Sequence, residues 1–234
     1  MDDSSAASGP AGNGNGGETL ASIVYEKLLQ DILTGELKPG LKLRLQVLKK
    51  DYDVGNSPLR EALNRLSENG MVIREENKGF RVALTSVKEL EELIRTRCWL
   101  EEIALRESIG NGDDKWEEGI VLAFHRLSRS SKTSGDDHYY TSPEWEQRHR
   151  EFHQAVLSAC NSDILLGYCA QLHEKTLRYR NLAAVVEYRE RHELEEHEAL
   201  KDAVLDRDAD RAVELLIKHF RVTADIVISS GSIS

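Results

Sequence analysis

The 234-residue sequence predicts a mainly α-helical protein of two domains. Apolar residues recur at intervals of three and four over most of the chain, which indicates amphipathic helices. Short strand-like runs occur within residues 72–83, between two helical parts. We therefore expect a tail over residues 1–17, a small domain of helices and a hairpin over residues 18–84, and an all-α helical bundle over residues 85–234.

The N-terminal part contains three helical patterns in succession. Residues 1–17 are small, polar and rich in glycine, which predicts a disordered tail. The first helix runs from about Thr19 to Gly35, and a shorter one covers about residues 45–52. A third helix follows the turn at residues 53–56. We expect its boundaries to be set as follows: Ser57 as N-cap, Pro58 in the first helical position and Gly70 just beyond the end.

Two short strands complete this domain, at residues 72–75 and 80–83, around a tip formed by residues 77–79. Three helices followed by a hairpin are the order of a winged helix-turn-helix, which places its third helix in the DNA major groove. Arg60, on the first turn of that helix, can pair with guanine or clamp a phosphate. The candidate DNA contacts lie at the second helix, the third helix or the hairpin tip: Arg44, Gln46, Asn56, Ser57, Arg60, Lys78 and Gly79. The alternative is a solvated, charged face on an ordinary small helical domain.

The net charge of −10 is unevenly distributed. Residues 18–83 hold 11 basic and 10 acidic side chains, whereas residues 84–234 hold 20 basic and 29 acidic ones. The acidity therefore lies in the C-terminal part, and the N-terminal domain stays compatible with DNA. The three cysteines, the absence of a secretory signal pattern and the absence of an apolar run of membrane length predict free thiols, a cytoplasmic location and no membrane partner.

The C-terminal part shows only helical patterns, the first opened by a capping box of Ser86 and Glu89. We expect helices at about residues 86–109, 115–131, 143–159, 163–190, 193–206 and 208–229. One of them carries His149 and His153 at positions i and i+4, on one face, where two imidazoles can chelate one metal ion. The alternative for such a pair is a solvated surface. The histidines that we interpret as surface or packing residues are His125, His138, His173 and His192.

Arginines in the helical part are candidates for binding a carboxylate. Arg97 lies within an otherwise apolar helix, and Arg178 and Arg180 flank Tyr179. A guanidinium that faces a pocket holds a carboxylate with two parallel hydrogen bonds. The alternative is pairing with the many nearby glutamates. We favour Arg97 and Arg180 as effector-binding residues.

Residues 25–82 resemble the N-terminal domain of the GntR family of bacterial transcriptional regulators. The matching motifs are Ile32-Leu33-x-Gly35-x-Leu37-x-Pro39-Gly40, Pro58-Leu59-Arg60-Glu61-Ala62-Leu63 and Lys78-Gly79-x-x-Val82. The family usually has an arginine that contacts DNA where this chain has Asn56. We therefore expect a different operator sequence. Asn56 either reads adenine or only serves the turn.

The rest of the chain is similar to the ligand-binding, FCD-type domain of the FadR branch of that family. The matching landmarks are Arg97-x-x-Leu100-Glu101, Phe152-His153, Glu196-His197 and Lys218-His219-Phe220. The resemblance implies a divalent metal held by an aspartate and three histidines. His149 stands at the aspartate position, so the implied ligands are His149, His153, His197 and His219. Four imidazoles without a carboxylate favour Zn or Ni.

The resemblance implies a transcription regulator of the repressor type that binds a palindromic operator as a homodimer and responds to a small carboxylate. Within the branch, Arg148-His149-x-x-Phe152-His153 and Arg178-Tyr179-Arg180 are most similar to a carbon-starvation-induced regulator that responds to glutarate-type acids. A metal-dependent hydrolase is the alternative, although we identify no general base and no carboxylate ligand pair beside the histidines. A structural module, with the acidic bundle as a dimer scaffold, is the third interpretation.

Overall fold

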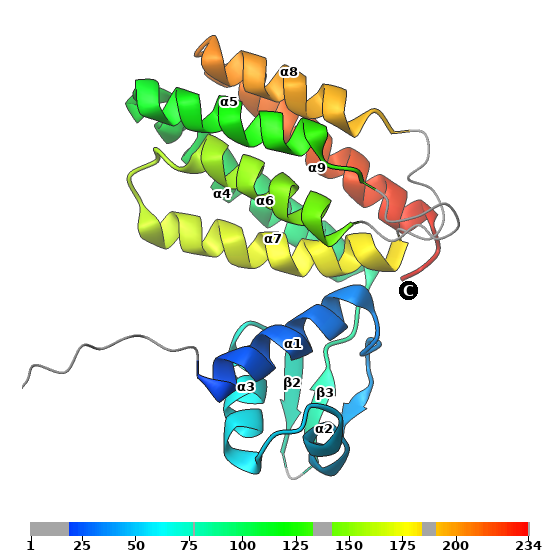
Figure 1. Ribbon diagram of the computed structural model, residues 1–234. Helices are drawn as coiled ribbons and strands as arrows, with labels where there is room; N and C mark the ends of the chain where they lie inside the picture. The colour runs from blue at the N-terminus through cyan, green and yellow to red at the C-terminus, as the bar shows by residue number, and fades with distance from the viewer. Residues whose placement is uncertain (1–18, 77, 133–141, 184–190, 234) are drawn as a thin grey trace, which may run out of the picture.

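The computed structural model describes residues 19–76, 78–132, 142–183 and 191–233, which form two domains (Figure 1). The elements of the first are α1 (Leu20–Thr34), β1 (Lys42–Leu43), α2 (Leu45–Asp51), α3 (Asn56–Glu68), β2 (Val72–Glu75) and β3 (Gly79–Val82). The elements of the second are α4 (Val87–Asn111), α5 (Asp114–Arg129), α6 (Pro143–Leu157), α7 (Asp163–Ala183), α8 (Glu193–Leu205) and α9 (Ala209–Ser229). The predicted fold class, a winged helix-turn-helix plus an all-α helical bundle, is confirmed.

The first domain packs α1 and α3 over a small antiparallel sheet in the order β1-β3-β2. Its core is aliphatic, with Leu28, Leu63 and Leu66 fully buried. Gly70 follows α3 with a φ of +71°, a left-handed conformation that suits glycine and ends the helix as predicted.

Two details of this domain differ from the prediction. The N-cap of α3 is Gly55, without a side-chain bond, so Ser57 lies inside the helix. The domain also has a third strand, β1, whose Leu43 is in register with Phe80 of β3. A strand of two residues is too short to show an alternating pattern, because at least four residues are needed.

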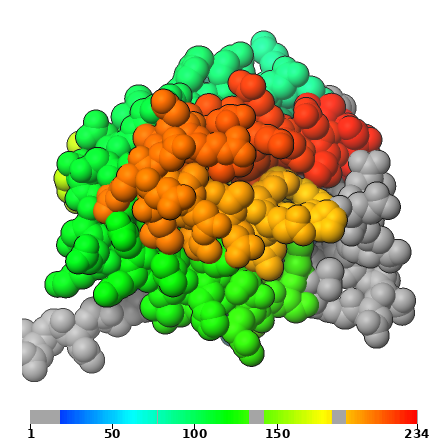
Figure 2. All heavy atoms as spheres, turned by 90° about the horizontal axis from the view of Figure 1, so that it is seen from above, coloured from blue at the N-terminus to red at the C-terminus, as the bar shows by residue number. Residues whose placement is uncertain are grey.

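The second domain is a bundle around α4, which packs against α9, α7 and α6. Helix α5 lies between α6 and α8, and Figure 2 shows α8 and α9 side by side on the upper face. The predicted helix boundaries are correct to within about two residues wherever they can be compared. The predicted tail 1–17, His138 and the end of the 163–190 segment lie outside the described residues. No helix among the described residues is long and apolar enough to cross a membrane.

The two domains meet along α7, which packs against α1 (Figure 1). Leu177 of α7 belongs to the apolar core of the winged-helix domain. The segment that joins β3 to α4 ends at Ser86, whose hydroxyl accepts a hydrogen bond of 3.1 Å from the Glu89 amide. The other half of the predicted capping box, from the Ser86 amide to the Glu89 side chain, does not form. The Glu89 carboxylate instead accepts a hydrogen bond from the hydroxyl of Tyr179 on α7. The bundle is therefore fastened to the winged helix at the start of α4.

Candidate functional site

Four histidines from three helices meet inside the bundle. His149 and His153 lie on α6, His197 on α8 and His219 on α9, and each is at most 5% exposed. The Nε2 atom of His153 lies 3.2 Å from Nε2 of His149 and 3.2 Å from Nε2 of His197. One ring nitrogen from each of the four lies within 4.8 Å of the others. The structure therefore brings together all four histidines singled out in the sequence.

Burial keeps these imidazoles in the form that binds metals. It lowers the pKa of His149 and His153 well below the ordinary value, with further lowering by Arg180 for His149 and by neighbouring rings for His153. The pKa of His197 falls to about 3, and that of His219 is also lowered. Neutral imidazoles carry a free lone pair at neutral pH, as ligation requires.

Carboxylates lie beside the cluster, contrary to the expectation from the sequence of no carboxylate ligand pair beside the histidines. Glu196 Oε2 lies 2.8 Å from His219 Nδ1 and Glu193 Oε1 lies 3.9 Å from His149 Nε2. Burial raises the pKa of Glu196, but hydrogen bonds from His219 and Arg191 outweigh it and lower the pKa to about 2. The signal missed in the sequence is the spacing of Glu193, which precedes His197 by four positions and Glu196 by three on α8 and can therefore lie beside both.

A second polar group adjoins the cluster on the side of α7. Glu146, His149 and His173 offer three donor atoms within 4.8 Å of one another. His173 is buried there, with Nε2 3.5 Å from Glu146 Oε1, and burial lowers its pKa to about 4. Glu146 Oε1 and His173 Nε2 have no hydrogen-bond partner among the described residues. Of the two interpretations for His173, packing therefore applies and surface does not.

The acidic groups around the cluster are balanced by bases. Glu146 pairs with Arg180, Glu193 with Lys132, and Glu196 with Arg191. With neutral histidines, three carboxylates thus face three cations. Among the described residues, these three pairs therefore carry no net formal charge.

The two predicted effector-binding arginines are both buried and both paired. Arg97 Nε donates to Glu101 at 2.7 Å, and its guanidinium lies 3.9 Å from the centre of the Phe220 ring. Arg180 pairs with Glu146, and its Nη1 lies 3.3 Å from Nδ1 of His149. Arg180 therefore touches the cluster directly, whereas the contacts of Arg97 are to its own helix and α9.

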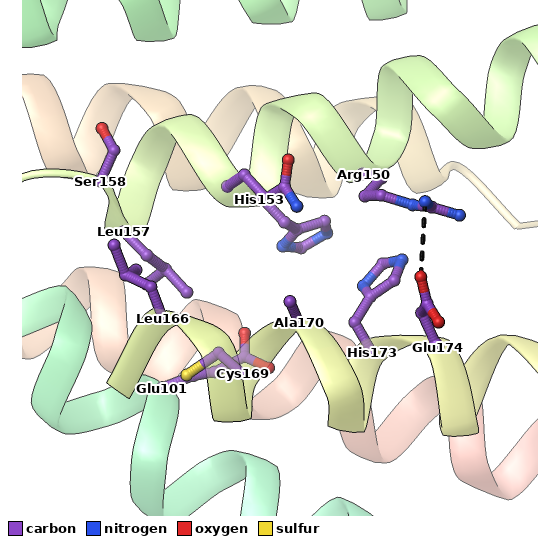
Figure 3. Close-up of a pocket in the computed structure, with 11 residues that line it drawn as sticks. Glu101, Arg150, His153, Leu157, Ser158, Leu166, Cys169, Ala170, His173 and Glu174 are labelled. Carbon is purple, nitrogen blue, oxygen red and sulfur yellow. Dashed lines mark ion pairs between the residues drawn. The ribbon is translucent and has the colours of Figure 1, made fainter. Parts of the chain in front are cut away.

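A cavity of about 230 Å³ opens beside the cluster, between α6 and α7 (Figure 3). His153 and His173 point into it from opposite helices, and Glu101 and Cys169 lie at its α4 side. Its volume equals that of about eight water molecules, enough for a short organic acid. His153 thus belongs both to the cluster and to the cavity wall.

The predicted DNA contacts are exposed on the winged-helix domain. Arg60 lies on the first turns of α3, and Lys78 and Gly79 lie at the hairpin tip. Among the described residues, no hydrogen bond or ion pair engages the side chains of the predicted contacts, so they are available to a partner: Arg44, Gln46, Asn56, Ser57, Arg60 and Lys78.

Comparison with known proteins identifies both domains. Residues 20–82 match the bacterial regulatory proteins of the gntR family, and residues 92–222 match the FCD domain. The chain belongs to the GntR family of transcriptional regulators and carries an FCD domain. The predicted membership of the FadR-type branch agrees with this domain pair.

Relatives of this GntR-family chain are regulators along nearly their whole length. It is 37% identical to the HTH-type transcriptional regulator BphR of Paraburkholderia xenovorans, over 91% of this chain and 87% of that protein. It is 32% identical to the HTH-type transcriptional repressor GlaR of Escherichia coli, over 87% of this chain and 93% of that protein. These matches decide against the hydrolase alternative, because the relatives and both families are transcriptional regulators.

Solved structures share the fold. E. coli McbR/YncC superposes with a TM-score of 0.73 at 23% identity, over 90% of this chain and 98% of that one. A putative transcriptional regulator GntR from Rhodococcus sp. RHA1 superposes with a TM-score of 0.68 at 20% identity, over 89% and 97% of the two chains. The arrangement of winged helix and bundle is therefore that of other regulators.

Proposed function

We propose that this regulator is a repressor whose operator affinity is controlled by a small organic acid bound beside a divalent metal ion. His149, His153, His197 and His219 hold the ion, with Zn or Ni as the metals that imidazoles favour. When bound, the ion supplies an electrophilic anchor for one carboxylate of the acid. Glutarate-type acids are the first candidates, from the resemblance of the α6 and α7 motifs.

The observation that carries the proposal is the meeting of four buried, neutral imidazoles, with one ring nitrogen from each within 4.8 Å of the others and Nε2 of His153 3.2 Å from that of His149 and of His197. Nδ1 of His219 lies 2.8 Å from Glu196 Oε2 and 3.1 Å from Arg191 Nη2; when Nδ1 donates to the carboxylate, Nε2 of that ring is left for ligation, a recurring arrangement at metal sites. Glu193 offers a carboxylate as a further ligand. The residues present therefore fit a divalent ion.

The charge balance supports an acid as the effector. Among the described residues, the carboxylates of Glu146, Glu193 and Glu196 are each already paired with a cation, so a divalent ion adds positive charge to a buried site. An anion beside it reduces that cost, because buried charges need partners. The cavity at His153 offers the space, and Arg180 or Arg97 would hold the far carboxylate by exchanging its present glutamate partner.

DNA binding by α3 and a homodimer complete the proposal. Arg60 and Asn56 would read bases, while Arg44, Gln46 and Ser57 contact the backbone and Lys78 with Gly79 approach the minor groove. A winged helix reads a short half-site, so a two-fold dimer would read a palindrome. A second copy would bind at the groove between α4 and α9 of the C-terminal domain. This groove is lined by acidic and basic side chains and by the exposed Trp99.

The test is an operator titration at fixed salt, with tag-free protein either stripped of metal or loaded with zinc. Glutarate and other short dicarboxylic acids are added to each form. We expect an acid to change operator affinity only for the zinc-loaded protein, because an effector acts through its differential affinity for two states. An equal response of the stripped protein would contradict the metal-anchored acid.

A further inference from the structure

One turn of α7 holds the winged-helix domain through hydrogen bonds to backbone carbonyls. Asn181 Nδ2 donates to the carbonyl of Leu33 in α1 at 2.8 Å. Arg178, fully buried, donates to the carbonyl of Ala83 at 3.5 Å and to that of Leu84 at 3.3 Å, just beyond β3. Movement of this turn must therefore strain or break contacts with both α1 and the end of the wing.

Tyr179, in the same turn, holds the start of α4. The hydroxyl of Tyr179 accepts a hydrogen bond of 3.3 Å from the Ser86 amide and donates to the Glu89 carboxylate. Tyr179 is fully buried, whereas the Glu89 side chain is 41% exposed, so the hydroxyl joins the bundle core to the surface end of the linking segment. The segment that links the two domains is thus held by α7 at both its ends.

Arg180, in the same turn, contacts the histidine cluster. Its Nη1 lies 3.3 Å from Nδ1 of His149. A guanidinium only donates hydrogen bonds, so this contact needs the lone pair of Nδ1 and leaves the ring hydrogen on Nε2, which faces His153 at 3.2 Å. While Arg180 makes this contact, Nε2 of His149 carries the ring hydrogen and cannot bind a metal ion.

Ligation by His149 through Nε2 requires the other tautomer of the ring, with the hydrogen on Nδ1. The ring hydrogen then lies on Nδ1 and meets the Arg180 donor, which is unfavourable. Glu146 Oε1 lies 3.8 Å from Nδ1 and has no hydrogen-bond partner among the described residues, so it can accept that hydrogen. Glu146 also lines a cavity of about 510 Å³ between α1, α6 and α7, which leaves room for these side chains to move.

We propose that Arg180 transmits the state of the histidine cluster to the winged-helix domain through the turn 178–181 of α7. The inference rests on the proposed metal site. When His149 becomes a ligand, Glu146 would accept a hydrogen bond from its Nδ1–H, and the contact between Arg180 and His149 would be lost. The guanidinium can then donate hydrogen bonds to the carboxylate of an organic acid. The accompanying shift of the turn 178–181 weakens or strengthens the hydrogen bonds that Arg178 and Tyr179 make to residues 83–89.

The experiment is hydrogen exchange, followed by mass spectrometry, on the full chain with zinc ions alone as the probe. Zinc binding is measured separately by calorimetry. The test variant is Glu146→Gln with Arg180→Met, which removes both charges and so leaves neither one buried alone. The control is Glu151→Gln with Arg148→Met, which neutralises a partly exposed ion pair within α6, with an N–O distance of 2.8 Å.

We expect zinc to change the exchange of residues 83–90 in the wild type and the control, and to lose that effect in the test variant although zinc still binds. Equal changes in the test variant, or a zinc-loaded wild type without any change there, would overturn the proposal. Calorimetry without zinc binding to the wild type would remove the proposed metal site and this inference with it. Should the test variant fail to fold, Arg178→Gln with Asn181→Ala cuts the same path on the domain side. It must bind zinc like the wild type and lose the exchange response.

Discussion

Nδ1 of His219 lies 2.8 Å from Oε2 of Glu196, and this bond aligns a ring of the cluster from outside. A carboxylate in this position fixes the ring orientation and makes the opposite nitrogen a better ligand. Arg191 holds the same carboxylate with an N–O distance of 2.5 Å, so the glutamate is itself fixed. The cluster is therefore supported by a shell of ion pairs as well as by burial.

Glu196→Gln should weaken zinc binding by about tenfold or more, because the amide orients His219 less well and removes the negative charge. Calorimetric titration of stripped protein measures it. Glu195→Gln is the matched control, since the Glu195 side chain is exposed and its ion pair among the described residues is with His192, outside the cluster. Equal affinities of Glu196→Gln and the wild type would mean that His219 is not a ligand or needs no support.

Arg60→Ala should reduce operator affinity by about 1–3 kcal/mol if the side chain reads a base. A binding titration at several salt concentrations measures it, since loss of a phosphate contact alone would mainly lower the salt dependence. Arg211→Ala, an exposed arginine of the bundle, is the control for charge. Unchanged affinity would exclude the role of Arg60.

Trp99→Asp should weaken the dimer by at least about tenfold, because Trp99 is 60% exposed beside the α4–α9 groove and would be buried by a second copy. Sedimentation over a range of protein concentrations measures it. Leu122→Asp, 49% exposed on α5, is the control. A wild type that stays monomeric at micromolar concentration, with or without DNA, would contradict the homodimer.

Metal-free protein should lose stability as the pH falls from about 6.5. Burial lowers the pKa of His173 to about 4 and of His197 to about 3, so below pH 6.5 the unfolded chain binds protons that the folded chain does not. Each such imidazole removes up to about 1.4 kcal/mol per pH unit. Urea unfolding at pH 7.5, 6.5 and 5.5 measures it, and His173→Gln should give a shallower slope. A flat profile would show that these rings are not buried in the neutral form.

Much of the fold was predictable because helical periodicity and end signals act locally. Ser86, Gly35 and Gly70 mark helix ends in the sequence, and they do so in the structure. Strand β1 was not predictable, since its two residues acquire strand geometry only by pairing with β3. The placement of α7 against α1 likewise depends on tertiary packing.

The site was predictable in part. His149 and His153 share a helix face, and the family landmarks point to the other two histidines, but no spacing indicates that Glu146 would meet Arg180 across 34 positions. His173 gave no signal either, because one histidine on an amphipathic helix has many ordinary explanations. Partners from different helices are fixed only by the packing of the bundle.

The metal content of protein purified without a histidine tag tests the central claim most directly. Elemental analysis of the wild type is compared with a His153→Ala, His197→Ala variant and with His125→Ala, which changes an exposed histidine. We expect about one divalent ion per chain in the wild type and the control and none in the double variant, with its fold verified by circular dichroism. A wild type without stoichiometric metal, even after incubation with zinc or nickel, would contradict the account.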